Sequence, residues 1–319
     1  MRGSLEQANS GATPGRGSDP KGYLHPRYAR AFEEFGRPRF LPSSGGWILE
    51  REIPGSTYRD AMGSYPRFFC RNWSGVCADV EAAGAGLVSL LVVTDPFATL
   101  AGDQLGACFD AVRPYKEHHI VDLKAPAGRR TSVDHRYKVR RARRDGVTVE
   151  RCEPTDHVDD WVRLYDVLGA RHEIRGLKRF SRASFAAQLS VPGAVMFRAV
   201  KAGATVAAHV WYLHDDIAYS HLQATDQAGY EARAPYLLYA EELDWLAARC
   251  AVADVGASAG SAARAADGLA QFKRGWATDK RPSYLCTRIF DRGAYDELTR
   301  ASGQGEEGYF PAYRSGELD

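Results

Sequence analysis

Alternating polar side chains near residue 220 have types and spacing that suit proton transfer. Tyr219, His221 and Gln223 alternate along a predicted strand at 217–224, so we expect all three on one face of a sheet. An imidazole with an ordinary pKa of about 6.5 can accept a proton near neutral pH, which favours His221 as a general base. A hydrogen-bonded histidine in a half-buried sheet is the structural alternative. His209, on the preceding predicted strand, gives a weaker signal of the same kind.

A second group of polar residues lies in the first half of the chain. Asp95 follows the apolar run 87–93, which is typical of a buried strand, and could take a proton from an acceptor amine. Three cationic residues could contact a phosphate or carboxylate of an acceptor: Lys116, Arg67 and Arg71. A purely structural role is the alternative for each.

The sequence lacks the usual signals of metal binding and of a covalent nucleophile. The nine histidines form no H-E-x-x-H or H-x-x-x-H, and the six cysteines form no C-x-x-C, so we expect no metal site. The adjacent pair His118–His119 would point to opposite sides of a strand. We expect all six cysteines to be reduced residues of a cytosolic protein. No G-x-S-x-G motif and no recognisable cysteine nucleophile is present, so the sequence predicts chemistry without a covalent nucleophile.

Charge and hydropathy exclude two broad classes. The 319 residues contain 42 Lys+Arg against 40 Asp+Glu, which excludes a globally basic nucleic-acid binder but permits a local patch. The longest apolar run, 85–93, is too short to span a bilayer, and residues 1–20 lack the apolar segment of a secretory signal. The mean hydropathy is −0.38. We therefore expect a cytoplasmic protein with no membrane span.

One dense basic segment, 129–144, contains eight Lys/Arg and a single acid, Asp134. At helical spacing, four of its arginines fall near one face: Arg136, Arg140, Arg143 and Arg144. Such a face suits nucleic-acid phosphates, and a solvated helix paired with nearby acids is the alternative.

The order of predicted elements is clearest in the second half. Hydrophobic periodicity predicts strands at 147–152, 194–200, 205–213, 217–224, 252–256 and 283–290, and helices from 155, at 182–189, at 233–249 and near 267. In the first half it predicts strands at 47–51, 67–72, 87–93 and 119–123 and a helix at 102–112.

This order resembles that of a GNAT acyltransferase domain. The segment Asp267–Trp276 (DGLAQFKRGW) is similar to the D-x-L-x-x-F-K-x-G-aromatic signature of the FemABX-like branch of the GNAT superfamily. The helix beginning RAPYLL at 233 and the segment VRRA at 139, ahead of VTVE at 147, resemble the same branch. The likeness implies an α+β fold of two tandem GNAT-like lobes, with mixed sheets flanked by helices. The expected divisions are a flexible tail (1–22), a degenerate N-terminal lobe (23–128), a basic connecting helix (129–146), a C-terminal lobe (147–300) and a tail (301–319).

The resemblance also implies an activity. Members of this branch move an amino acid from aminoacyl-tRNA onto an amine of a peptide, cell-wall or natural-product precursor, with no cofactor beyond that co-substrate. Lys273 would face the acyl carbonyl and stabilise its negative charge, and Phe272 would pack against the terminal adenosine or the acyl group. Gln223, Tyr219 and Tyr236 would line the acyl channel. The basic segment would bind the tRNA acceptor stem.

One departure from ordinary GNAT enzymes concerns coenzyme A. CoA-dependent members have a Q/R-x-x-G-x-G/A loop whose backbone N–H groups bind the pyrophosphate. The corresponding segment, 227–235, has a single glycine, a repelling carboxylate at Glu231 and no N–H at Pro235. This favours aminoacyl-tRNA over CoA. An acyl-CoA-dependent N-acyltransferase and a non-catalytic GNAT-like binding module are the alternatives.

Overall fold

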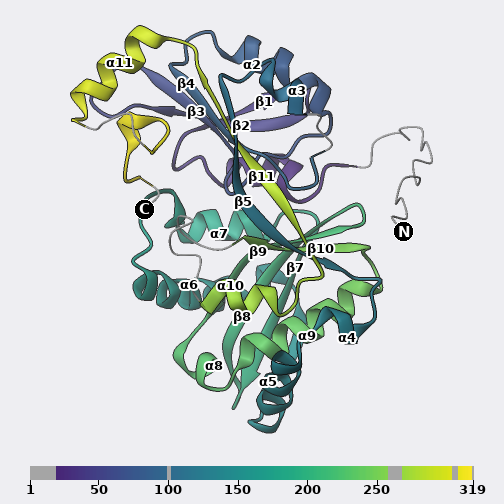
Figure 1. Ribbon diagram of the computed structural model, residues 1–319. Helices are drawn as coiled ribbons and strands as arrows, with labels where there is room; N and C mark the ends of the chain where they lie inside the picture. Colours follow the sequence, from purple (N-terminus) through teal and green to yellow (C-terminus); the bar gives the residue numbers. More distant parts are fainter. Residues whose placement is uncertain (1–18, 99–101, 258–267, 304–307, 318–319) are drawn as a thin grey trace, which may run out of the picture.

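One mixed sheet organises the chain in the computed structural model, which describes residues 19–98, 102–257, 268–303 and 308–317 (Figure 1). Its 11 strands lie in the order β1-β2-β3-β4-β11-β5-β10-β9-β8-β7-β6 across this described part. Neighbouring strands are antiparallel except at β3/β4 and β9/β10, which are parallel. The mixed sheet flanked by helices that the sequence predicts is therefore present, and one continuous sheet runs through both halves of the described chain.

The strands are β1 (Arg37–Leu41), β2 (Gly46–Glu52), β3 (Arg59–Gly63), β4 (Ser89–Val93), β5 (Ala111–Asp122), β6 (Thr148–Cys152), β7 (Ala194–Lys201), β8 (Ala204–His214), β9 (Ile217–Thr225), β10 (Val252–Ala257) and β11 (Asp279–Ile289). The α-helices are α1 (Pro26–Arg30), α2 (Val76–Ala83), α3 (Gly102–Gly106), α4 (Ala127–Arg130), α5 (Val133–Arg144), α6 (Val158–His172), α7 (Arg182–Leu189), α8 (Gln227–Glu231), α9 (Ala234–Ala247), α10 (Gly268–Arg274) and α11 (Arg292–Ala301).

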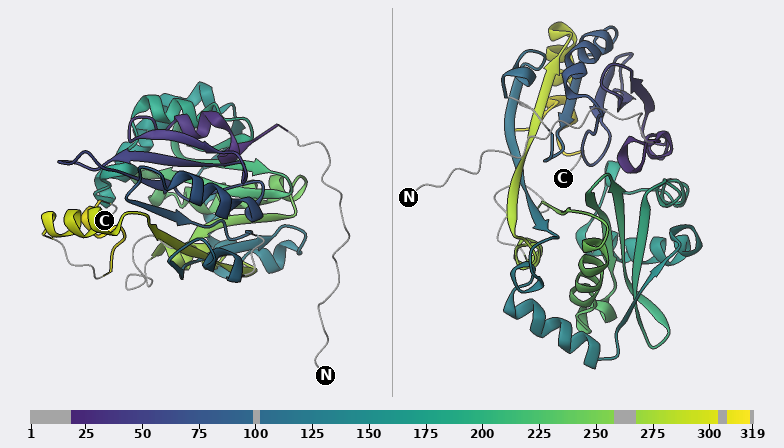
Figure 2. Two further views of the ribbon diagram at one scale, coloured as in Figure 1. Left: turned by 90° about the horizontal axis from the view of Figure 1, so that it is seen from above. Right: turned by 90° about the vertical axis from the view of Figure 1, so that its right-hand side faces the viewer.

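Two long strands join the halves of the molecule. β5 and β11 run side by side through both halves, as the right-hand view of Figure 2 shows. The first part of β11 pairs with β5 beside β10, and its last part, 285–289, pairs with β4. Residues 279–317, which the sequence placed in the second lobe and tail, thus continue into the sheet and helices of the first half (Figure 1). The two halves are held together by backbone hydrogen bonds, not by a linker alone.

Helices cover both faces of the second half of the sheet. On one face α9 packs over β7–β10, with its fully buried Leu238 and Leu246 in a core that also contains residues of α5. On the other face α1, α6 and α7 enclose an aromatic core around Tyr28 and Trp161. Each fully buried leucine contributes roughly 1.5–3 kcal/mol of transfer free energy. These two cores fix β8 and β9 between them.

Several predicted elements of the first half are wrong. Residues 67–72 form no strand; Phe68 makes only an isolated bridge to Thr94. The helix predicted at 102–112 ends at Gly106, and the strand predicted at 119–123 begins at Ala111. The exposed first part of β5 carries polar side chains and a proline, so it shows no apolar alternation.

The cysteine prediction is wrong for one pair. Cys77 on α2 and Cys108 beyond α3 form a disulfide, with their Cα atoms 5.1 Å apart. Cys70, Cys152, Cys250 and Cys286 are free. Residues that are far apart in sequence give no spacing signal of such a pair, which explains why the sequence did not indicate it.

Candidate functional site

The sheet opens between β9 and β10. These parallel strands pair over only three positions, the last of which joins Tyr219 and Asp254. Beyond this point β10 bulges and stays with β5, reaching Ala257 opposite His118. Residues of β9 that follow Tyr219 therefore have no strand on one side, and Ser220 is partly exposed although β9 is central in the sheet. We call this place the β9–β10 opening.

A buried charged cluster lies beside the opening. Arg67, from the loop after β3, places its Nη1 2.5 Å from Asp254 Oδ2 and 2.7 Å from His118 Nδ1. We call these three residues the junction cluster, because they come from both halves of the sheet. Burial alone would raise the pKa of Asp254, but Arg67 and His118 hold it well below its usual range. Burial lowers the pKa of His118, although the neighbouring Asp254 opposes the shift.

Asp95 follows β4, as predicted, and faces the same cluster. Its Oδ2 accepts a hydrogen bond from the Tyr219 hydroxyl at 3.2 Å. Burial raises the pKa of Asp95 to about 6, although Arg67 opposes the shift. Its other carboxylate oxygen, Oδ1, is buried and accepts no hydrogen bond from the described residues. A carboxylate with a raised pKa and an acceptor oxygen that no described residue engages is suited to proton transfer near neutral pH.

His221 is poorly suited to the base role that its sequence position indicated. Its Nε2 lies 2.8 Å from Gln188 Oε1, and its Nδ1 lies 3.1 Å from the Tyr23 hydroxyl. The amide oxygen can only accept, so Nε2 carries the proton and Nδ1 accepts from Tyr23. Burial lowers the pKa of His221 to about 3. Because neither partner of His221 is an anion that would stabilise its cation, His221 is a weaker candidate for the proton acceptor than Asp95.

The prediction that Gln223 shares a face with Tyr219 and His221 is wrong. The β8–β9 register shifts between Val210 and Trp211, which makes His221 the extra residue of a bulge. Tyr219 lies opposite Tyr212, in the core under α6 and α7. Gln223 lies opposite His209, which contacts α9 on the other face. A bulge has no reliable sequence signal, so alternation failed at this point.

Lys273 reaches the far side of the opening. Its Nζ donates a 2.6 Å hydrogen bond to the carbonyl of Ala257, at the end of β10. Gly256 makes this approach possible, because a Cβ there would lie 2.9 Å from Nζ. His119 faces the same ammonium, and burial together with Lys273 lowers the pKa of His119 to about 4. Both of its ring nitrogens are buried without a hydrogen-bond partner among the described residues.

The rest of the F-K-x-G motif holds α10 in place. The carbonyl of Phe272 lies 2.9 Å from His135 Nε2 on α5, and a Cβ at Gly275 would overlap that imidazole. The Phe272 ring packs edge-to-face on Tyr236 and Tyr239 of α9. The motif's first residue, Asp267, lies outside the described residues. The motif therefore anchors α10 so that Lys273 faces the opening.

Tyr236 lies between helices at the start of α9. Its hydroxyl accepts a 3.2 Å hydrogen bond from Lys138 Nζ, and its ring meets His135 edge-to-face. It is in contact with Phe272 and so belongs to the packing around α10. Its predicted place in an acyl channel stays a prediction.

The basic segment forms α4 and α5, and its arginines differ in their surroundings. Arg136 Nη1 donates to the backbone carbonyls of Thr131 at 2.6 Å and Gly128 at 3.3 Å, so it braces the turn between the helices. Arg143 pairs with exposed Glu241 at 2.6 Å. Arg140 and Arg144 are exposed, as is the aromatic ring of Tyr137. These last residues form the surface best suited to phosphates.

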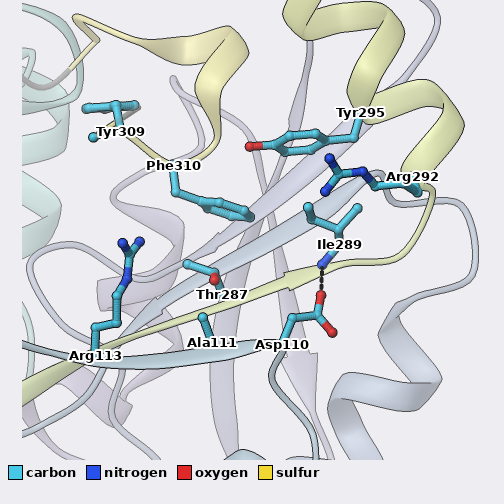
Figure 3. Close-up of a pocket in the computed structure, with 10 residues that line it drawn as sticks. Asp110, Ala111, Arg113, Thr287, Ile289, Arg292, Tyr295, Tyr309 and Phe310 are labelled. Carbon is cyan, nitrogen blue, oxygen red and sulfur yellow. Dashed lines mark hydrogen bonds between the residues drawn. The ribbon is translucent and has the colours of Figure 1, made fainter. Parts of the chain in front are cut away.

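Because side chains alternate between the two faces of β5, the polar residues of segment 113–119 lie in different surroundings. His118 faces the junction cluster and His119 faces Lys273. Lys116 is half-buried near Lys178, and burial followed by that neighbour lowers its pKa. Arg113 lies three residues before Lys116 on β5, about 10 Å away along the strand, and lines a different cavity of about 220 Å³. Figure 3 shows Arg113 extending toward the segment that carries Phe310.

Arg67 and Arg71, which flank Phe68–Phe69 in the sequence, also lie in different surroundings. Arg71 is exposed and packs against Gly45 in the loop after β1. Arg67 is buried and bound to Asp254, so its charge is committed to the junction cluster. Of the three predicted acceptor contacts, Lys116 and Arg71 keep exposed surface, and Arg67 is better assigned to positioning.

Sequence reasoning missed Asp254 as a functional residue. It is fully buried within the otherwise apolar strand Val252–Ala257. A lone acid inside a short apolar strand is a usable signal, because a buried carboxylate requires a partner. Among the described residues no group of three or more His, Cys, Asp or Glu is placed to hold a metal ion. None of the helices described has the length and apolar character needed to cross a bilayer.

Comparisons with known proteins bear on the fold. The sequence matches no protein-family model and no curated protein. The structure is similar to that of FemX, with a TM-score of 0.65 and 13% identity over 88% of this chain and 95% of that one. L-PGS from Bacillus licheniformis has a TM-score of 0.56 and 16% identity, covering 85% of this chain and 94% of that one. A Bacteroides thetaiotaomicron protein of unknown function has a TM-score of 0.59 and 13% identity, covering 85% and 93%. These likenesses show a FemX-like fold.

Proposed function

We propose that this protein is an aminoacyltransferase that moves an amino acid from aminoacyl-tRNA onto an amine acceptor, forming an amide bond. The observation that carries the proposal is the position of Lys273. Its ammonium reaches the β9–β10 opening, where it can hold an acyl carbonyl as negative charge develops on the oxygen. The FemABX-like fold supports the same reaction class.

Asp95 supplies the acid–base function of the proposal. An acceptor amine loses a proton as it attacks the acyl carbon, and the Oδ1 of Asp95 can accept it. Over the whole reaction one C–N bond forms and one ester C–O bond breaks. The proton lost by the amine ends on the released ribose hydroxyl, so atoms and charge balance without a cofactor.

The surroundings of α8 and α9 favour aminoacyl-tRNA over acyl-CoA. Asp226 caps α8 by accepting a 2.8 Å hydrogen bond from the Gly229 N–H, so a carboxylate occupies the donor that a pyrophosphate would need. Pro235 lies in the first turn of α9 and lacks an N–H. Both features add to the unfavourable charge at Glu231. An acyl-CoA-dependent transferase and a non-catalytic binding module stay as the alternatives.

The exposed part of α5 is the proposed contact with the tRNA acceptor stem. Arg140 and Arg144 lie one helical turn apart with Tyr137 beside them, a combination suited to phosphates and an unpaired base. Arg136 contributes to this surface indirectly, because it holds the turn at Thr131. Lys116 and Arg71 are the proposed contacts for an anionic acceptor.

A binding comparison tests the donor. Aminoacyl-tRNA and acetyl-CoA are each titrated against the wild type and against the double variant Arg140→Ala/Arg144→Ala at two salt concentrations. We expect salt-sensitive tRNA binding whose slope against log salt falls by about 1 to 2 in the variant. The double variant Arg182→Ala/Arg300→Ala, which removes two exposed helical arginines elsewhere, is the control. Tight acetyl-CoA binding without tRNA binding would contradict the proposal, and acceptor binding without transfer would favour the binding module.

A further inference from the structure

A serine, a histidine and a glutamate form a hydrogen-bonded chain on the α9 face of the sheet. His209 Nε2 lies 2.8 Å from Ser220 Oγ, and His209 Nδ1 lies 2.8 Å from Glu242 Oε2. His209 on β8 and Glu242 on α9 are fully buried, whereas Ser220 on β9 is partly exposed. This chain is separate from the junction cluster, which lies on the other face of β9. We call it the Ser220 relay.

The direction of its hydrogen bonds follows from the chemistry of its members. A carboxylate only accepts, so His209 Nδ1 carries a proton and donates it to Glu242. The other ring nitrogen, Nε2, is then an acceptor and receives the hydrogen bond of the Ser220 hydroxyl. The Tyr239 hydroxyl lies within hydrogen-bonding reach of Ser220 as well. Serine is thus bonded to an imidazole whose orientation is fixed by a carboxylate, the arrangement that activates serine nucleophiles.

The position of the relay suits attack on a bound acyl group. Ser220 is the first residue of β9 beyond its last pair with β10, so this partly exposed residue lies where the sheet opens. Gln223 follows on the same face, opposite His209, and its Nε2 is buried without an acceptor among the described residues. This amide is a candidate donor to an oxyanion. Tyr239, which contacts Ser220, also packs against Phe272, the residue before Lys273.

We propose that Ser220 is a catalytic nucleophile that takes the acyl group from an activated ester donor and holds it as a seryl ester. In the first step the Ser220 Oγ–carbon bond forms, the ester C–O bond of the donor breaks, and the serine proton passes through His209 Nε2 to the departing oxygen. In the second step an acceptor amine attacks the seryl ester, so that a C–N bond forms and the Ser220 Oγ–carbon bond breaks. The amine proton passes through His209 Nε2 to Oγ and restores the serine hydroxyl. The identity of the natural donor rests on the proposed function, but the nucleophile does not.

Two serine-directed probes test the proposal without any tRNA. The full chain is treated with a small alkyl fluorophosphonate, which loses fluoride when a serine attacks phosphorus, and the adduct is located by peptide mass spectrometry. In a parallel experiment p-nitrophenyl acetate reports an acyl burst. We expect one adduct per chain on Ser220 and a burst of about one equivalent. Ser220→Ala should abolish both, while Ser74→Ala, which removes an exposed hydroxyl bonded to Asn72, should change neither.

Substitutions of the relay distinguish chemistry from packing. Glu242→Gln preserves size and should slow labelling of Ser220 by about 100-fold or more, because the imidazole loses its orienting carboxylate. Circular dichroism and urea unfolding of the same variant establish that it is folded. Failure of both probes to modify wild-type Ser220 would overturn the proposal, as would equal labelling of Ser220 and Ser74. If tRNA binding fails but Ser220 is labelled, the proposed function is wrong and the nucleophile stands.

Discussion

Two histidines on neighbouring strands, His209 and His221, are both buried and both bonded at each ring nitrogen, yet their partners differ. His221 lies between an amide oxygen and a tyrosine hydroxyl. His209 lies between a carboxylate and a serine hydroxyl. A carboxylate can stabilise the imidazolium that forms when a histidine takes a proton, whereas an amide cannot do so as well. Partners, and not burial, therefore decide which histidine is suited to chemistry.

The faces of β9 differ in the same way. On the face of His221, the junction cluster binds its charges to one another and ties the two halves of the sheet together. On the face of His209, the chain of hydrogen bonds ends at Ser220, a partly exposed residue. We infer that the first face mainly supplies stability and a base at its edge, and that the second supplies a nucleophile. The following predictions separate these roles.

The largest expected effect is on stability. Arg67→Met leaves the carboxylate of Asp254 buried without its guanidinium, and we expect a loss of about 3–5 kcal/mol in the free energy of unfolding, measured by urea denaturation. Arg182→Met, which breaks the exposed pair with Asp159, should cost less than about 1 kcal/mol. Equal losses in the two variants would show that the junction cluster does not join the halves.

The two histidines should differ in catalysis. His209→Gln should lower the rate of donor-ester cleavage about 100-fold, because serine loses its base. His221→Gln should leave the pH dependence of this rate unaltered, because His221 keeps its neutral form throughout the working range. A change in the pH profile of the His221 variant, with a normal profile in the His209 variant, would reverse the assignment of roles.

Asp95→Asn should raise stability at pH 7 by about 3 kcal/mol. Burial raises the folded-state pKa of Asp95 to about 6 from an ordinary 3.8, so ionisation of this carboxylate opposes folding as pH rises between these values. The gain should disappear below about pH 4, where the carboxyl is protonated in both states. In the Asp95→Asn variant, the rate of transfer to an amine should no longer change with pH as it does when a group with a pKa near 6 must be ionised. Unfolding curves at pH 4 and pH 7 that show the same difference would contradict this account.

The smallest expected effect concerns the close approach of Lys273 to Gly256. Gly256 and Gly203 have nearly equal positive φ angles, +83° and +81°, so alanine strains both backbones by about 1 kcal/mol. A Cβ at Gly256 would also displace Lys273 Nζ, whereas nothing lies within 4 Å of a Cβ at Gly203. We therefore expect Gly256→Ala to lower transfer several-fold while Gly203→Ala does not. Equal transfer rates in the two variants would show that the position of Lys273 at the β9–β10 opening does not affect the reaction.

The sequence predicted the second half of the molecule better than the first. Strands β7–β9 and helix α9 have strong apolar patterns because both faces of this part of the sheet are covered by helices. β5 and β11 could not be predicted in full, because each extends beyond the covered region, and α11 has no long apolar run. Their pairing is set by contacts between residues far apart in the chain.

The candidate site was predictable only where a single residue carries its own signal. Asp95 after a buried strand and Lys273 in its motif lie at the opening or beside it. Ser220 and Glu242 have no local signature, because a serine becomes a nucleophile candidate only when tertiary packing brings a histidine and a carboxylate to it. The bulge at His221, which moves Gln223 to the face of Ser220, is likewise a product of strand pairing.

The most direct test of the central claim is the discharge of aminoacyl-tRNA by this protein in the presence of a simple amine such as glycinamide. Amide product and deacylated tRNA are measured together for the wild type, Lys273→Met and Lys280→Met. We expect equal amounts of both products from the wild type, a loss of about 100-fold or more for Lys273→Met, and near wild-type transfer for Lys280→Met, whose exposed ammonium pairs with Glu117. Unchanged tRNA with all three proteins, or the same rate for both lysine variants, would contradict the account.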